Sequence, residues 1–151
     1  MVDILPPKKE ITDPRVHFIT ANIDEFVAPP ASYDRIIMTC VLHHLPEPIA
    51  TLSAINSWLK PGGLFTLFLP SDPGILNRIN RKVTVNRRAT KYGFENYEFV
   101  NAIEHRNHYW GLKVQIMNVF GDCKIKRWYY PFRIPLAGFS LFSIWHISIP
   151  K

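Results

Sequence analysis

The sequence predicts an α/β protein built around a parallel strand–helix–strand unit, and two observations lead to that prediction. Residues 33–69 follow the order strand, loop, helix, turn and strand, which is the order of a βαβ unit. Hydrophobic residues make up 47% of the 151 positions and charged residues 20%, values of a globular chain that can bury its own core. We expect one domain over residues 15–151, preceded by a leader over residues 1–14 that is rich in proline and charge.

The unit 33–69 begins with the apolar run Ile36–Met38, which is typical of a strand buried on both faces. Its helix carries apolar residues at three- and four-residue spacing: Leu52, Ile55, Trp58 and Leu59. Lys60 suits the C-terminus of that helix. Residues 61–63 then end the helix with a Pro-Gly-Gly turn, and residues 64–69 form the second strand.

Two motifs in this unit resemble class I S-adenosylmethionine-dependent methyltransferases. A Leu-His-His-Leu loop at residues 42–45 follows the first strand, and a Leu-Lys-Pro-Gly-Gly turn at residues 59–63 comes about fifteen residues later. The resemblance covers residues 15–151 and implies a partial Rossmann-like methyltransferase sheet, strands three to seven of the family, with flanking helices. It also implies that the last strand is inserted antiparallel beside the fifth and that S-adenosylmethionine is the cofactor.

Residues 15–26 alternate between apolar and polar side chains and are predicted to form the third strand of the family sheet. By the resemblance, Asn22 and Ile23 meet the adenine ring; the alternative is that Asn22 is only a turn residue. The family's glycine-rich first loop is absent before Arg15. We therefore expect an N-terminally truncated domain. Either the third strand pairs with the fourth, or a dimer partner or missing segment fills the gap.

By the same resemblance, Thr39, Cys40 and Val41 lie at the carboxyl edge of the sheet and face the methionine part of the cofactor. His44 either lies near the transferred methyl group or holds the loop by hydrogen bonds. Cys40 is expected to be a small buried residue rather than a nucleophile. With two cysteines and no ligand spacing typical of zinc, the sequence predicts no metal site, reduced thiols and a cytoplasmic location.

Residues 75–94 are predicted to contain a basic helix, since they include six Lys or Arg and no Asp or Glu. One apolar face is marked by Leu76, Ile79 and Val83. Asp72 and Pro73 are predicted to be its N-cap and first-turn residues. The local charge suggests an anionic substrate, an anionic membrane surface or nucleic acid, or simply a solvated helix face. We expect Arg78 to bind an anionic group of the methyl acceptor.

A polar cluster occupies residues 104–108. His105, oriented by Glu104 or another carboxylate, is predicted to act as a general base toward a hydroxyl or amine. Arg106 and His108 are predicted to bind the acceptor, and the spacing of His105 and His108 would allow them to share a helix face. The alternative is a solvated, helix-capping cluster.

The C-terminal part is predicted to form a helix through residues 112–120 and strands at 123–132 and 139–149, the sixth and seventh of the family sheet. The apolar tail 134–150 is shorter than the roughly 20 residues that a membrane span needs. The sequence predicts a methyltransferase for a small-molecule acceptor, such as an anionic sugar or lipid-linked glycan, with no nucleic-acid partner. The alternatives are a non-catalytic truncated remnant and a Rossmann nucleotide-binding domain of another chemistry, which the missing phosphate-binding loop disfavours.

Overall fold

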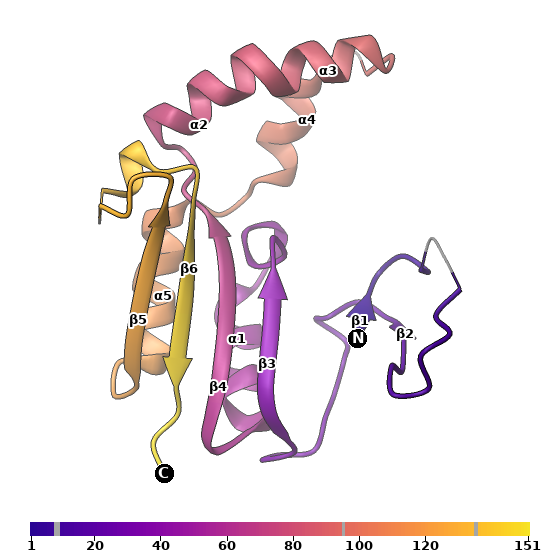
Figure 1. Ribbon diagram of the computed structural model, residues 1–151, viewed down its shortest axis with the longest axis vertical. Coiled ribbons are helices and arrows are strands. Elements are labelled where there is room, and N and C mark those ends of the chain that lie inside the picture. The colour runs from indigo at the N-terminus through magenta and orange to yellow at the C-terminus, as the bar shows by residue number, and fades with distance from the viewer. Residues whose placement is uncertain (8–9, 95, 135) are drawn as a thin grey trace.

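The computed structural model describes residues 1–7, 10–94, 96–134 and 136–151. Its centre is a four-stranded sheet with the order β3-β4-β6-β5 (Figure 1). The strands are β3 (Tyr33–Thr39), β4 (Leu59–Pro70), β5 (Lys124–Tyr130) and β6 (Phe142–Ser148). The pair β3–β4 is parallel, whereas β6 runs antiparallel to both β4 and β5. The predicted α/β class and the antiparallel insertion of the last strand are confirmed.

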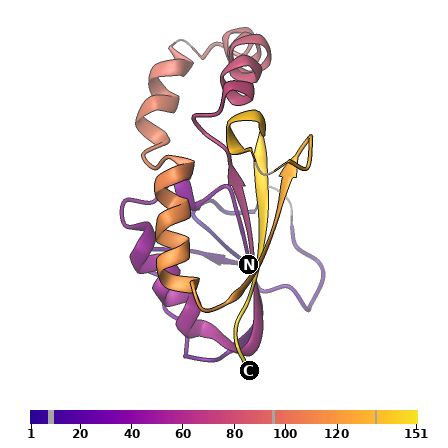
Figure 2. The ribbon, with the colours of Figure 1, turned by 90° about the vertical axis from the view of Figure 1, so that its left-hand side faces the viewer.

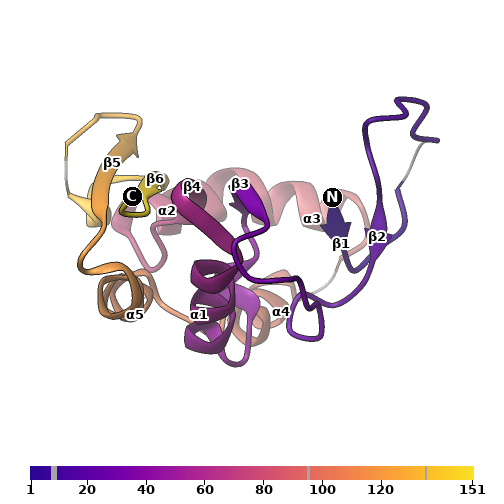
Figure 3. The same ribbon diagram turned by 90° about the horizontal axis from the view of Figure 1, so that it is seen from below.

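Two helices, α1 (Pro48–Trp58) and α5 (Tyr109–Phe120), cover one face of the sheet (Figures 2 and 3). Because successive side chains of a strand point to opposite faces, every second residue of β4 is buried there. The fully buried side chains of the two helices and of β4 include Leu52, Ile55, Phe65, Leu67, Leu69, Leu112, Ile116 and Phe120. The apolar residues at three- and four-residue spacing in both helices are therefore the ones buried in the core.

The first helix ends earlier than the sequence predicts. Leu59 and Lys60 belong to β4, and Lys60 pairs with Asp34 of the neighbouring strand instead of lying at a helix C-terminus. The Pro-Gly-Gly sequence at residues 61–63 also lies within β4. Gly62 has a φ of 76°, a conformation that costs glycine little, and its backbone N–H donates to the carbonyl of Pro150.

The opposite face of the sheet carries no helix among the described elements (Figure 3). Ile37 on this face is 60% exposed, whereas Met38 is buried and Ile36 is half-buried. The prediction of a strand buried on both faces is wrong for Ile36–Met38. The reason is that β3 is an edge strand with helices on one side only.

A helical segment extends beyond the carboxyl end of β4 (Figure 1). It consists of α2 (Ile75–Asn80), a π-helical turn (Arg81–Val85) and α3 (Asn86–Lys91), and α4 (Tyr97–Glu104) follows it. The basic helix is confirmed, but Ile79 and Val83 are exposed, so its apolar face is not a core face. Asp72 and Pro73 do not begin this helix. Its N-cap is Gly74, and the side chain of Asp72 instead forms a hydrogen bond with His105.

Residues 15–26 do not form the predicted long strand. Only Ile19–Thr20 (β2) are extended in a ladder, and they pair with Val2–Asp3 (β1) from the expected leader. A strand needs partners for its backbone N–H and C=O groups, and within the described residues this segment finds only two. Pairing of this segment with the strand now labelled β3, one of the two expected outcomes, is not observed. No helix of the described residues is both long and apolar enough to cross a bilayer.

Candidate functional site

Three segments meet at the carboxyl edge of the parallel strands. The 3-10 turn η1 (Leu42–His44) follows β3, Asp72 follows β4, and His105 lies between α4 and α5. Ligands of open α/β sheets bind outside this edge. The side chains of these three segments therefore lie where a substrate would be expected to bind.

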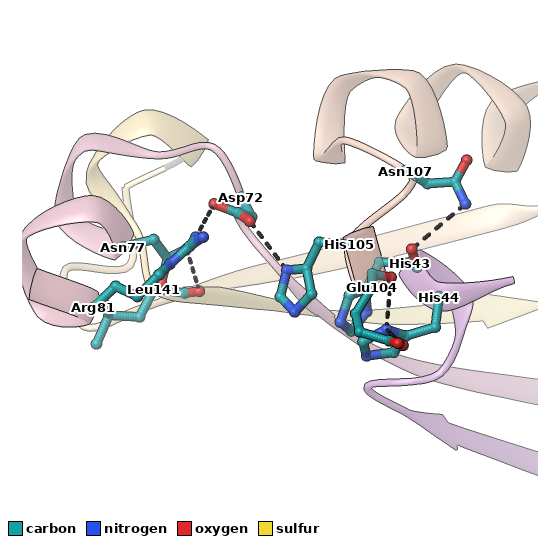
Figure 4. Close-up of polar contacts among 9 residues, drawn as sticks. All are labelled: His43, His44, Asp72, Asn77, Arg81, Glu104, His105, Asn107 and Leu141. Atoms are coloured by element: carbon teal, nitrogen blue, oxygen red, sulfur yellow. Dashed lines mark hydrogen bonds and ion pairs between the residues drawn. The ribbon is translucent and has the colours of Figure 1, made fainter. Parts of the chain in front are cut away.

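The best-defined contact of the site joins Asp72 and His105 (Figure 4). His105 Nδ1 lies 3.1 Å from Asp72 Oδ2, while the other carboxylate oxygen accepts from the guanidinium of Arg81. The hydrogen bond from His105 is the main reason that the pKa of Asp72 lies below its ordinary value, and Arg81 lowers it further. Because an ionised carboxylate only accepts, His105 must carry its proton on Nδ1. Its Nε2 then holds a free lone pair whenever the ring is neutral.

His44 is held in the same way by a different oxygen. Its Nδ1 lies 2.9 Å from the backbone carbonyl oxygen of Glu104, which can only accept (Figure 4). This bond and Asn107 tie the loop after β3 to the segment between α4 and α5. The Asn107 backbone N–H donates to the carbonyl of His43 at 3.2 Å, and its side-chain amide donates to the carbonyl of Leu45 at 2.7 Å. The hydrogen bond of His44 agrees with the loop-holding option, and a place near the transferred methyl group stays a prediction.

His43 lies between these groups and is buried. Its ring centroid is 3.9 Å from that of His44 and 4.6 Å from that of His105. Burial, followed by the two neighbouring imidazoles, lowers the pKa of His43 to about 3, so this ring is neutral near pH 7. Its Nδ1 is buried without a hydrogen-bond partner among the described residues. A bound acceptor or water could satisfy that nitrogen.

The sequence predicts no metal site, and this stays a prediction. Ring nitrogens of His43, His44 and His105 lie within 4.8 Å of one another. Imidazoles of this number are a donor set that zinc and similar ions use once the nitrogens converge on one point. The hydrogen bonds of His105 and His44 serve a proton-transfer role equally well, because both rings keep Nε2 free.

The residues expected at the methionine part of the cofactor lie at the open end of β3. Thr39, Cys40 and Val41 are exposed there. Cys40 is therefore not the buried residue that was expected; its φ of 53° turns the chain out of the strand, and its N–H donates to the carbonyl of Phe68 at 3.2 Å. Burial of the thiol nevertheless raises the pKa of Cys40, which disfavours a nucleophilic role. These three residues fit one wall of a cofactor site.

The residues expected at the adenine ring lie in a turn at the same end of the sheet. Thr51, in the first turn of α1, donates to Asp24 at 3.1 Å and so fixes the turn. The Asn22 side-chain oxygen accepts from the N–H of Asp24 at 3.2 Å, and Ile23 packs against the core. This hydrogen bond agrees with the turn role of Asn22 and engages one acceptor lone pair of its side-chain oxygen, while the contact with adenine stays a prediction.

The residues expected to bind the acceptor come from two elements. Arg106 and His108 are exposed in the segment between α4 and α5. His108 is the N-cap of α5 whereas His105 follows the end of α4, so the two do not share a helix face. Arg78 lines a hollow of about 340 Å³ together with Ile79, Arg81, Lys82 and Glu98. Arg81 connects this hollow to Asp72 and so to His105.

Sequence reasoning gave no site role to Asp72, to Arg81 of the basic helix or to Asn107 of the polar cluster 104–108. An Asp before a proline and a helix is a strong capping pattern, and it was interpreted as a cap alone. A carboxylate, that of Glu104 or another residue, was expected to orient His105. The carboxylate that contacts His105 is that of Asp72 and not that of Glu104. The signal that could have found Asp72 is its place directly after a parallel strand.

A parallel βαβ unit with the last strand inserted antiparallel defines an α/β domain of the Rossmann-like class. The model of a family described as "methyltransferase domain" matches residues 1–128 of this chain. The chain therefore belongs to that methyltransferase family, and the resemblance seen in the Leu-His-His-Leu and Lys-Pro-Gly-Gly motifs is confirmed.

A curated relative is malonyl-[acyl-carrier protein] O-methyltransferase of Halalkalibacterium halodurans, which is 37% identical over 68 residues. The match covers 42% of this chain and 25% of the relative, so the chain spans a quarter of that protein's length.

Two solved structures share the fold. A SAM-dependent methyltransferase from Archaeoglobus fulgidus has a TM-score of 0.60 at 11% identity, covering 91% of this chain and 69% of that one. The Burkholderia thailandensis 1,6-didemethyltoxoflavin-N1-methyltransferase has a TM-score of 0.59 at 17% identity, covering 99% and 60%. The latter holds S-adenosylhomocysteine and 1,6-didemethyltoxoflavin. S-adenosylmethionine, the cofactor expected from the sequence, is therefore supported at the level of the family.

Proposed function

We propose that this chain is an S-adenosylmethionine-dependent methyltransferase that acts on a small, anionic acceptor and uses His105 as a general base. The observation that carries the proposal is the Asp72–His105 pair at the carboxyl edge of the parallel strands, with Nδ1 and Oδ2 3.1 Å apart. A general base needs a free lone pair and a partner that orients the ring, and His105 has both.

The roles of the protein groups follow from their hydrogen bonds. His105 Nε2 accepts the proton of an acceptor hydroxyl or amine. Asp72 holds the Nδ1 proton in place and stabilises the imidazolium that forms, while Arg81 keeps Asp72 ionised. S-adenosylmethionine, when bound, supplies an electrophilic methyl group. We assign its contact to the wall formed by Thr39, Cys40 and Val41, with His44 beside it and the Asn22–Ile23 turn at the adenine end.

The acceptor side of the proposal rests on charge. Arg78 and Lys82 line the hollow beside Arg81, against a single carboxylate, that of Glu98. Arg106 and His108 stand exposed next to His105. Cationic groups on both sides of the Asp72–His105 pair favour an acceptor with phosphate or carboxylate groups, such as an anionic sugar or a lipid-linked glycan. The Burkholderia relative holds a small molecule, 1,6-didemethyltoxoflavin, which supports a small acceptor but does not bear on its charge.

A cytoplasmic location is part of the proposal. Cys40 and Cys123 are both free thiols, as expected in a reducing compartment.

The second candidate is a non-catalytic remnant of such an enzyme. The open edge of β3 favours it, since Thr39, Cys40 and Val41 provide one wall only and Ile37 is left exposed beside them. A dimer partner or a further segment that completes the wall would restore the first candidate.

Calorimetric titration with S-adenosylmethionine separates the two candidates. We expect saturable binding, and transfer of a radiolabelled methyl group to anionic glycans or glycolipids. His105→Gln should keep cofactor binding and lower transfer at least about a hundredfold, whereas the exposed His17→Gln should change neither. No heat from folded protein, at a cofactor concentration well above that which saturates an ordinary methyltransferase, would identify a remnant. Binding with equal transfer by both variants would remove His105 from the mechanism.

A further inference from the structure

The helical segment 75–91 presents apolar side chains to solvent. Ile75, Ile79 and Val83 recur every four residues and are 54%, 54% and 51% exposed. Residues four apart on a helix lie on one side, so these three make an apolar stripe. Ile79 lines a hollow with Glu98 of α4, and about half of each of the three side chains remains exposed.

A second apolar surface lies on the connection between β5 and β6. Phe132, Ile134, Leu136 and Phe139 line a hollow of about 290 Å³ there, and each of the four is at least half exposed. Asn77 of α2 donates through its side-chain amide to the carbonyl of Leu141 at 2.9 Å, so α2 lies beside the connection between β5 and β6. We call the two surfaces together the helix–loop patch. Exposed apolar surface on neighbouring elements can mark a place where a protein meets a partner or a membrane.

The charges around the helix–loop patch are mostly positive, and the carboxylate beside the stripe is that of Glu98. Arg78 and Lys82 flank the stripe, Arg87, Arg88 and Lys91 extend it along the helix, and Arg133 lies within the loop; all six are exposed. From Ile75 to Phe94 the sequence has no Asp or Glu. Apolar side chains bordered by Lys and Arg are the pattern of a helix that lies in the headgroup region of an anionic membrane.

We propose that the helix–loop patch docks this protein on the surface of an anionic phospholipid bilayer. Isoleucine, valine and phenylalanine side chains enter the acyl boundary, and the Arg and Lys side chains contact lipid phosphates. Nucleic acid would use the charges but would leave the apolar stripe and the apolar hollow without a partner, so the membrane is favoured. The inference goes beyond the proposed function and does not rest on it, because docking needs neither cofactor nor acceptor.

Docking through the helix–loop patch would bring the candidate site close to the bilayer. The segment that carries the stripe starts directly after Asp72, and Arg81 on the same segment contacts Asp72. A protein docked through this surface holds the Asp72–His105 pair close to the bilayer, where a lipid-linked acceptor would be presented.

Co-sedimentation of the full chain with vesicles tests the inference. We expect binding to vesicles of equal parts phosphatidylcholine and phosphatidylglycerol, little binding to phosphatidylcholine alone, and weaker binding as salt rises. Arg78→Gln with Lys82→Gln should weaken binding about 25-fold, roughly fivefold for each charge. The matched control, Lys124→Gln with Lys126→Gln, removes two exposed charges at the opposite end of β5 and should change binding less than about twofold.

The apolar part of the patch is tested separately. Ile79→Ser with Phe132→Ser should abolish vesicle binding while circular dichroism stays unchanged, since both side chains are more than half exposed. A second measurement does not rely on the loss of vesicle binding. Phe132→Trp should add tryptophan fluorescence that brominated lipids quench when the protein binds.

Several outcomes would overturn the inference. These are no binding by the folded chain, equal weakening by the Lys124 and Lys126 control, and no quenching of the added tryptophan. Binding to a single-stranded oligonucleotide in preference to the vesicles would assign the charges to nucleic acid. A dimer that the Ile79 and Phe132 variant dissociates would assign the patch to a second copy of the chain.

Discussion

His105 Nδ1 lies 3.1 Å from Asp72 Oδ2, although 33 residues separate the two in the chain. The contact brings the connection after β4 against the break between α4 and α5. Arg81 completes it from the basic helix. One carboxylate thus holds together the connection after β4, the basic helix and the break between α4 and α5.

Removal of that carboxylate should cost stability. Asp72→Ala leaves Arg81 and His105 without their acceptor in a setting where the three side chains are only 15–23% exposed. Because hydrogen bonds to charged groups contribute about 1.5–3 kcal/mol each, we expect a loss of about that size in the free energy of unfolding. Urea denaturation at neutral pH measures it.

Asp34→Ala is the matched control for Asp72→Ala. Asp34 also pairs with a cation, Lys60, but its side chain is 85% exposed. Exposed pairs contribute at most about 1 kcal/mol, so the control should lose less than Asp72→Ala. Equal losses would mean that the Asp72 cluster is as weakly held as a surface ion pair.

Stability should fall in mild acid because of His43. The folded pKa of His43 is lowered from 6.5 to about 3, so between these values the unfolded chain binds a proton that the folded chain does not. The stability that His43 contributes is present above about pH 6.5 and is lost as the pH falls from there toward 3. The limiting slope is about 1.4 kcal/mol per pH unit.

Denaturation curves at several pH values between neutrality and mild acid measure this slope. His43→Gln should flatten it, whereas the exposed His17→Gln should leave it unchanged. A slope that survives in His43→Gln would place the titrating group elsewhere.

Two glycines should respond to the same substitution in opposite directions. A Cβ on Gly63 would lie 2.8 Å from the backbone oxygen of Lys60, a contact that only a backbone shift relieves. We expect Gly63→Ala to cost about 1–3 kcal/mol, as overpacking does. Gly111 lies in α5 with nothing within 4 Å of its Cβ position. Gly111→Ala should therefore stabilise the protein by up to about 1 kcal/mol.

Thermal unfolding of the two glycine variants, compared with the unchanged chain, gives both signs in one experiment. A lower melting temperature for Gly111→Ala, or an unchanged one for Gly63→Ala, would contradict the packing described for these positions.

The open edge of β3 should cause self-association. Its outer backbone groups have no ladder partner among the described residues, and Ile37 beside them is 60% exposed. An exposed apolar edge strand is a template for another chain, and a lysine on it discourages pairing. We expect Ile37→Lys to shift the sedimentation profile toward monomer.

Val114→Lys is the control for the edge, because it introduces the same charge on an exposed position of α5. It should leave the sedimentation profile of the unchanged chain as it is. If the unchanged chain is monomeric even at high concentration, the β3 edge does not mediate self-association.

Much of the fold was determined by the sequence alone. The apolar spacing of Leu52, Ile55 and Trp58 and of residues 112–120 predicted two amphipathic helices, and runs of apolar residues predicted β4 and β6. These are local patterns, and burial of one side of each element is enough to enforce them. Local motifs also predicted the methyltransferase family, the cofactor class and a chemical role for His105.

Tertiary structure alone decided which partners these elements find. Residues 15–26 have the alternation of a strand, yet they pair only with Val2–Asp3, because a ladder depends on a neighbour and not on the pattern. Asp72 has the pattern of a helix cap, yet it binds His105 and Arg81, since its place after β4 brings it to both. Ile37, Ile79 and Val83 are apolar but exposed, because burial requires a covering element that the local sequence does not encode.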